Sequence, residues 1–214
     1  MSRRHVRHMA EHFRSTPPRA MLPLVVLLLA VLPLGGCAVL RGPTALPGML
    51  PADWPARRSA LQEWPRFDLR GRVAVASGTD GFTAALRWAQ RSGVARLEID
   101  GPLGVGGLRL ELTDGRFADE SARAELERRL GFTLPVASLR YWLLGVPDPA
   151  SAAEEVLAAD ALRLDGLRQA GWSIRFAAYA PVPDADYELP QRIEVTRASV
   201  RVRLLVDGWG SARP

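Results

Sequence analysis

From residue 67 onward, apolar and polar residues alternate along a series of short stretches. Side chains of a strand point alternately to opposite faces, so this period predicts strands with one buried and one exposed face. Turn-forming residues separate the stretches at Gly78-Thr79-Asp80-Gly81, Arg91-Ser92-Gly93 and Asp114-Gly115, which favours antiparallel hairpins. The first four stretches are FDLRGRVAVAS, FTAALRWAQ, VARLEID and GLRLELTDG, which begin at Phe67, Phe82, Val94 and Gly107.

Helical spacing replaces this alternation in the middle of the chain. The stretch SARAELERRLG has apolar residues three and four positions apart, and Gly131 is expected to cap its C-terminus. The stretch PVASLRYWLLG carries an apolar stripe, with Pro135 expected at the first helical position. A further short helix is predicted at residues 56–64.

Strand-like alternation resumes over residues 162–180 and 192–209. The resulting order is strands, two helices and strands again, without a β-α-β rhythm. This order predicts a mainly β (α+β) fold, in which an antiparallel sheet curls around an apolar interior and helices cover one side.

The N-terminal 36 residues have the features of a signal peptide: a basic region, a 14-residue apolar run at 21–34 and two small residues before the only cysteine. The apolar run is shorter than the ~20 residues that span a bilayer. The sequence LGGC resembles a bacterial lipobox, which predicts a lipid on Cys37. Ala38 follows in place of the aspartate that favours inner-membrane retention in that class, so the outer membrane is expected. Residues 37–55 are rich in proline and glycine and are predicted to form a tether.

The excess of basic residues lies mostly in this leader. Residues 1–36 hold five of the 28 basic and one of the 23 acidic residues, which leaves 23 and 22 and a net charge of +1 for the rest. A nucleic-acid-binding protein is therefore not expected. Lysine is absent, and all three histidines lie in the leader, so His- or Cys-based catalysis, a metal site of these residues and Schiff-base chemistry are excluded. No cofactor and no enzymatic activity are predicted.

Two carboxylate pairs, Asp119-Glu120 and Glu154-Glu155, leave a carboxylate-based hydrolase open as an alternative. Adjacent carboxylates in polar stretches more often form a solvated surface, and we expect this here. The glycine-rich run GPLGVGG at 101–107 matches neither G-x-G-x-x-G nor the P-loop pattern.

A series of short motifs resembles the LolB family of outer-membrane lipoprotein receptors, in order and at plausible spacing from about Trp64 to Trp209. The motifs are Gly71-Arg72-Val73, Leu86-Arg87-Trp88, Gly101-Pro102-Leu103-Gly104, Leu130-Gly131, Leu134-Pro135-Val136, Leu139-Arg140-Tyr141-Trp142, Gly145, Gly171-Trp172, Tyr179, Leu189-Pro190 and Trp209.

This resemblance implies a single domain over residues 56–210, built as an open antiparallel β-barrel around a hydrophobic cavity with a helical lid. It implies a receptor, lipid-anchored on the periplasmic side of the outer membrane, that accepts acylated lipoproteins from a LolA-type periplasmic carrier and incorporates them into that membrane. We expect a monomer. An anchored scaffold lipoprotein of the envelope, whose interior is an ordinary packed core, is the main alternative.

Leu103 is the first candidate site residue. Turns usually lie at the surface, and an exposed leucine between Pro102 and Gly104 suits contact with lipid. In the family, the leucine of this loop delivers cargo to the membrane, so Gly101, Pro102, Leu103 and Gly104 form the predicted membrane-insertion loop.

Four tryptophans are candidates for the interior. Trp88 and Trp142 are expected to line a cavity, whereas Trp172 and Trp209 are expected to pack in the core. The arginines at 70, 72, 201 and 203 are expected on a solvated outer face.

Overall fold

The chain divides into two units, of which residues 45–214 form the second. The computed structural model describes residues 53–101, 107–183 and 185–210, which all belong to the second unit. The buried hydrophobic residues described in this unit, except Val75 and Ala84, form one core cluster between Trp54 and Trp209. The second unit therefore carries a core of its own, as an independently folding domain does.

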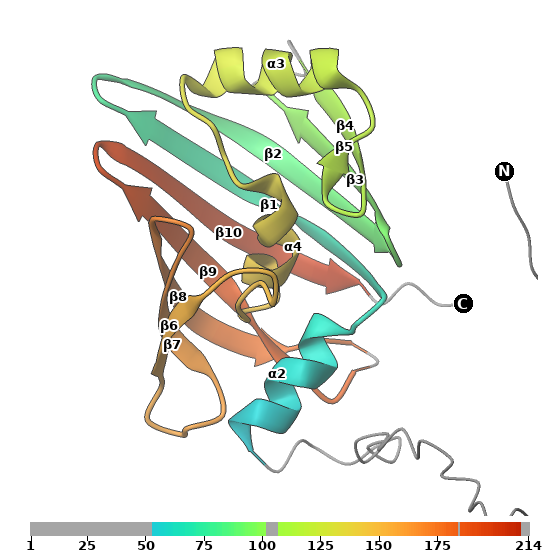
Figure 1. Cartoon of the computed structure of the whole chain (residues 1–214), viewed down its shortest axis with the longest axis vertical. Helices are drawn as coiled ribbons and strands as arrows, with labels where there is room; N and C mark the ends of the chain where they lie inside the picture. The colour runs from blue at the N-terminus through green and yellow to red at the C-terminus, as the bar shows by residue number, and fades with distance from the viewer. Residues whose placement is uncertain (1–52, 102–106, 184, 211–214) are drawn as a thin grey trace, which may run out of the picture. The chain divides into compact units, whose positions relative to one another are not determined.

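The domain is built on one ten-stranded antiparallel sheet (Figure 1). The strand order is β5-β4-β3-β2-β1-β10-β9-β8-β7-β6, so the first long strand pairs with the last, and the end strands β5 and β6 do not pair with each other. The strands are β1 (Arg66–Ser77), β2 (Asp80–Arg91), β3 (Val94–Asp100), β4 (Leu108–Thr113), β5 (Arg116–Phe117), β6 (Ala153–Leu157), β7 (Leu164–Gln169), β8 (Trp172–Pro181), β9 (Glu188–Arg197) and β10 (Val200–Gly210).

Tight turns set the register of the hairpins, as predicted. Asp114 and Gly115 connect β4 to β5 with φ values of 49° and 74°, and Ala170 and Gly171 connect β7 to β8 with 52° and 76°. Two positive φ angles are what a type I′ hairpin requires. The turn between β1 and β2 is narrower than the predicted four residues, because Ser77 already pairs with Asp80.

The sheet bends at Gly71. The pairing of β1 with β10 shifts register between Arg70 and Gly71, and a Cβ at Gly71 would lie 2.4 Å from the carbonyl oxygen of Leu205. Only glycine fits this close approach. A bulge of this kind increases local twist and curvature, so the centre of the sheet curves around the interior.

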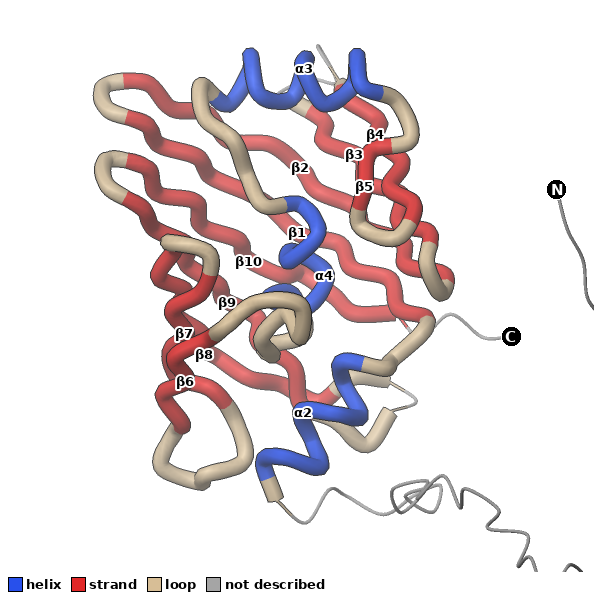
Figure 2. Tube along the Cα trace, in the orientation of Figure 1, coloured by secondary structure: helices blue, strands red, loops and turns tan. Residues whose placement is uncertain are grey.

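Three helices lie over the same face of the sheet (Figure 2). They are α2 (Trp54–Gln62), α3 (Glu120–Leu130) and α4 (Val136–Leu143). Gly131 caps α3 with φ 75°, as predicted. Pro135 is the N-cap of α4 instead of its first residue, because its ψ of 78° is not helical. Among the described residues, no helix is both long and apolar enough to cross a bilayer.

The inward strand faces form the core, as the alternation predicts, with exceptions at Phe82 and Ala178. Phe82 lies near the β1–β2 turn and is 38% exposed. Ala178 is exposed because its φ of 54° breaks the alternation of β8. The outward arginines at 70, 72, 201 and 203 are all exposed, as expected.

Candidate functional site

An apolar cavity of about 100 Å³ lies between the sheet and the helices. On the sheet side it is lined by inward residues of β1, β2, β3, β9 and β10, and every lining side chain is a hydrocarbon or aromatic one. On the helical side, α3, α4 and the segment between them contribute Leu126, Leu130, Phe132, Leu134, Val136, Leu139, Trp142 and Leu143. A dry cavity of this kind is suited to hydrocarbon and not to water.

Trp88 and Trp142 both lie on the wall of this cavity. Their indole N–H groups are taken up by buried amides: Trp88 Nε1 donates to Gln90 Oε1 at 3.2 Å, and Trp142 Nε1 donates to Gln169 Oε1 at 2.9 Å. The tryptophans therefore add apolar surface without leaving an unpaired donor. Neither glutamine was predicted from the sequence, although Gln90 occupies an inward position of a strand.

Gln169 also fixes the end of α4. Its amide nitrogen donates to the carbonyl oxygens of Asp148 and Ser151 at 2.8 and 2.9 Å, and the amide N–H of Asp148 donates to Gln169 Oε1 at 2.9 Å. Ser138 Oγ on α4 donates to Asp148 Oδ2 at 2.7 Å. A buried network with its members paired rigidifies the elements that it joins, so α4 is held firmly against β7.

The other helix over the cavity, α3, is held more weakly. Leu126 is its only buried residue. Its N-cap, Asp119, accepts from the amide N–H of Ser121 at 2.8 Å, which stabilises the helix but does not tie it to the sheet. Phe132, just after α3, packs against Trp172 with ring centroids 5.8 Å apart.

A second cavity, of about 260 Å³ and with a mixed polar and apolar lining, adjoins the first and shares Trp88 and Val136 as walls. Arg140 Nη2 donates to the carbonyl oxygen of Trp64 at 2.9 Å, but Arg140 Nε is buried and has no hydrogen-bond partner among the described residues. A buried donor without an acceptor is costly. An amphipathic ligand would find apolar surface and polar groups side by side here. The polar side chains that line this cavity are Gln90, Asp114, Arg140, Tyr141 and Asp148.

The structure places two further predicted sites only in part. Gly101 directly follows β3 and is half-buried, while Pro102, Leu103 and Gly104 lie outside the described residues, as does Cys37. The segment at 101–107 joins the paired strands β3 and β4 at one end of the sheet.

One expectation about the carboxylates is wrong. Glu155 is not a solvated surface residue: its side chain is 19% exposed, receives a hydrogen bond from Trp54 Nε1 and pairs with Arg58 at 2.8 Å. Helix α2 covers it and brings both donors. Glu154, by contrast, is 78% exposed. In the other pair, Asp119 is the N-cap of α3 and Glu120 is the first residue of that helix.

Comparison with known proteins gives the class and then the family. The family model described as "Outer membrane lipoprotein LolB" matches residues 65–209. Proteins named Outer-membrane lipoprotein LolB from Pseudomonas aeruginosa (strain UCBPP-PA14) and Nitrosococcus oceani are each 34% identical to this chain; they cover 82% and 87% of it, and the matches span 90% and 96% of those proteins. The corresponding protein of Halorhodospira halophila is 33% identical, over 85% of this chain and 92% of its own.

The chain is thus an outer-membrane lipoprotein. It belongs to the LolB family. Among solved structures, a LolA superfamily protein from Nitrosomonas europaea superposes with a TM-score of 0.49 and 8% identity, over 76% of this chain and 94% of that one. A likeness at this level carries no functional argument.

Proposed function

We propose that this protein receives acylated lipoproteins from a LolA-type periplasmic carrier and incorporates them into the outer membrane. The observation that carries the proposal is the wholly apolar cavity between sheet and helices in a LolB-family lipoprotein. Acyl chains leave water at a gain of about 0.8 kcal/mol per buried methylene. Transfer between carrier, receptor and membrane then needs only differences in affinity, and neither nucleotide nor metal.

In this proposal the curved sheet acts as an open β-barrel and the helical segment over it acts as a lid. A cavity of about 100 Å³ accommodates roughly seven to ten water-sized groups, at ~10–15 Å³ each, which is less than a fatty acyl chain requires. The lid must therefore move before a chain can enter. We assign the movement to α3, because Leu126 is its only buried residue, whereas α4 is fixed through Ser138 and Trp142.

The mixed lining of the second cavity, beside the wholly apolar first one, supports an amphipathic ligand over a plain hydrocarbon. An acylated cysteine carries ester and amide carbonyl oxygens next to its acyl chains. These oxygens are acceptors of the kind that the buried Arg140 Nε–H lacks. We propose that the acyl chains occupy the apolar cavity while the carbonyl groups face Arg140.

The membrane side of the proposal follows the sequence. Residues 1–36 are removed as a signal peptide, Cys37 is lipidated, residues 37–55 form the tether, and residues 56–210 form the receptor domain. More than one acyl chain on Cys37 would give stable anchoring. Leu103 enters the bilayer when cargo is released.

A transfer assay tests this function. The carrier, loaded with a labelled lipoprotein, is mixed with the soluble chain that lacks the leader and carries Cys37→Ala. We expect the label to move onto this protein. If the label stays on a carrier that delivers to another receptor, the protein is an anchored scaffold instead.

A further inference from the structure

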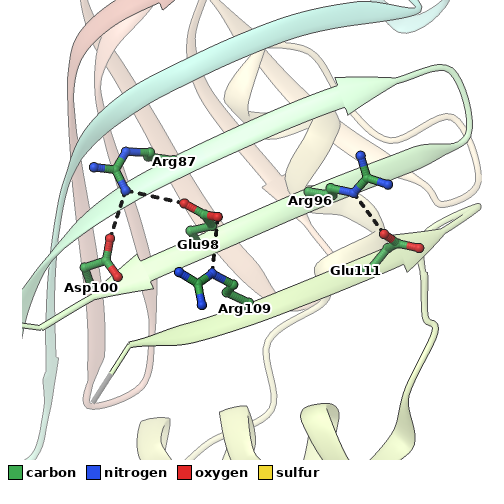
Figure 3. A network of polar contacts seen from close by, with 6 residues as sticks. All are labelled: Arg87, Arg96, Glu98, Asp100, Arg109 and Glu111. Carbon is green, nitrogen blue, oxygen red and sulfur yellow. Dashed lines mark hydrogen bonds and ion pairs between the residues drawn. The ribbon is translucent and has the colours of Figure 1, made fainter. Parts of the chain in front are cut away.

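The outer face of the sheet has two halves that differ in charge. Over β2, β3 and β4, basic and acidic side chains pair across the strands (Figure 3). Arg87 pairs with Asp100 at 3.0 Å, Arg96 with Glu111 at 3.0 Å, and Arg109 with Glu98 at 3.4 Å. These three arginines and three carboxylates balance one another, and Arg91, at the end of β2, pairs with Asp68 of β1 at 2.9 Å.

The same face over β1, β8, β9 and β10 is basic. We call five of its arginines the basic patch: Arg72, Arg175, Arg192, Arg201 and Arg203. All five are exposed. The carboxylates among them are Glu194, paired with Arg203 at 2.6 Å, and Asp207, paired with Arg72 at 2.9 Å.

Three members of the basic patch have no carboxylate partner within the described part of the chain, namely Arg175, Arg192 and Arg201. The register places Arg203 and Arg175 opposite Glu194 from its two sides. The hydrogen bond from Arg203 lowers the pKa of Glu194, and the charges of Arg201 and Arg175 lower it further. One carboxylate therefore lies in the field of three arginines, and the patch keeps a net charge of +3.

A shallow groove of about 820 Å³ lies across the boundary between the two halves, and β1, β9 and β10 line it together with β2 and the end of β3. Its lining includes the small side chains of Ala74, Thr83 and Ala85, and three arginines of the basic patch, Arg72, Arg192 and Arg203. Leu205 lies among the arginines and is 37% exposed. The groove extends to Gly101, which precedes Leu103 by two residues. No described helix covers this face, since all three lie on the other one.

We propose that the basic patch binds the anionic headgroups of phospholipids and holds the receptor face-on to the membrane while cargo is released. Charge complementarity indicates an anionic partner, and arginine pairs well with phosphate. An exposed leucine among arginines suits the mixed polar and apolar interfacial layer. The choice of a membrane over an acidic protein rests on the proposed function, in which Leu103 enters the bilayer.

Vesicle binding without cargo tests the patch. The soluble Cys37→Ala chain is floated with vesicles of phosphatidylethanolamine and phosphatidylglycerol, and with vesicles of phosphatidylethanolamine and phosphatidylcholine. Arg175→Gln/Arg192→Gln removes two unpaired patch charges. The control variant, Arg96→Gln/Arg128→Gln, removes one arginine from β3 and one from α3. These two arginines pair with Glu111 and Glu125. Circular dichroism verifies that each variant is folded.

We expect binding only to the anionic vesicles, weaker at higher salt. Because each basic residue near an anionic surface changes the binding constant roughly fivefold, the patch variant should bind at least about tenfold more weakly, whereas the control variant keeps wild-type binding. Equal losses in both variants would show that only net charge matters and would overturn the proposal. Patch-dependent binding to an acidic protein but not to vesicles would overturn it too.

The outcome is separable from the receptor function. Vesicle binding needs neither carrier nor cargo. If the transfer assay fails while flotation depends on the basic patch, the receptor function is rejected and lipid binding by the patch is kept. If transfer is normal and the patch variant floats like the wild type, only lipid binding by the basic patch is rejected.

Discussion

Buried polar groups around the cavity are arranged so that the cavity itself stays apolar. The two wall tryptophans turn their N–H groups to Gln90 and Gln169, and the remaining amide groups of Gln169 are taken up by backbone. Arg140 departs from this rule, since its buried Nε has no partner among the described residues.

Arg140→Met should weaken binding of a diacylated lipopeptide by about tenfold or more, since a charge-assisted hydrogen bond contributes about 1.5–3 kcal/mol. Binding of a long-chain alkane, which has no polar acceptor, should stay within a factor of about two, because the apolar cavity is unchanged. Titration by tryptophan fluorescence measures both ligands. An equal loss for both would mean that Arg140 only supports the fold, through its bond to the Trp64 carbonyl.

Leu103→Glu should leave cargo uptake from the carrier intact and abolish release of cargo into vesicles. A carboxylate on the insertion loop cannot enter hydrocarbon without a large desolvation cost. Leu162→Glu is the matched control, because Leu162 is a leucine that is 38% exposed and lies in the turn before β7. A Leu103 variant that releases cargo at the wild-type rate would contradict the assigned role.

The inward placement of the wall tryptophans was predictable for Trp88, which shares the alternation of β2 with Leu86. Their partners were not, because Trp142 and Gln169 are 27 residues apart and meet only in the folded domain. Whether an inward tryptophan lines a cavity or packs in a core depends on how the opposite layer fits, and periodicity contains no such information.

Helix α2 is attached to the edge strand β6 through Glu155, which receives hydrogen bonds from Trp54 and Arg58. The sequence did not predict β6, because the run Glu154-Glu155-Val156-Leu157 lacks alternation and both Val156 and Leu157 are exposed. An edge strand pairs with only one neighbour, so its apolar and polar residues need not alternate as strictly as those of a central strand. The adjacent carboxylates Glu154 and Glu155 were therefore expected to be solvated, although Glu155 holds α2 against β6 through these two hydrogen bonds.

Glu155→Ala should lower the free energy of unfolding by about 1–3 kcal/mol, since it leaves an indole N–H and a guanidinium without their partner in a partly buried place. Glu154→Ala should change it by less than about 0.5 kcal/mol, as surface substitutions do. Urea denaturation followed by tryptophan fluorescence compares the two variants. Similar effects of both would show that the Glu155 contacts do not stabilise the domain.

The two helices over the cavity should differ in mobility. We expect amides of α3 to exchange with solvent faster than those of α4, because local opening costs less where few apolar contacts are lost. Leu126→Ala should speed exchange in α3 further and leave β8 and β9 unchanged. Hydrogen exchange measured by mass spectrometry resolves these segments. Stronger protection of α3 than of α4 would assign the moving lid to another element.

In the whole domain, one curved sheet separates two surfaces of different chemistry. The inner surface holds the apolar cavity, and the outer surface is charge-balanced over β2 to β4 and basic over β1 and β8 to β10. A receptor that moves lipid toward a membrane needs both an interior for hydrocarbon and an exterior that meets headgroups.

The layered plan of sheet and helices could be predicted, because turn residues and periodicity are local signals. The strand order could not. Pairing of β1 with β10 joins segments more than 100 residues apart. The alternation of apolar and polar residues does not determine which strands pair with each other. The bend at Gly71 likewise depends on the carbonyl of Leu205 on the partner strand.

Photo-crosslinking during transfer tests the receptor function most directly. A benzophenone amino acid replaces either Ile99, which lines the cavity, or the adjacent Glu98, which lies on the outer face of β3. The carrier delivers a lipoprotein with a labelled acyl chain, and the mixture is irradiated. We predict that the label is captured at position 99 and not at position 98. Equal capture at both positions, or capture at neither while the carrier loses its cargo, would contradict acyl transfer through this cavity.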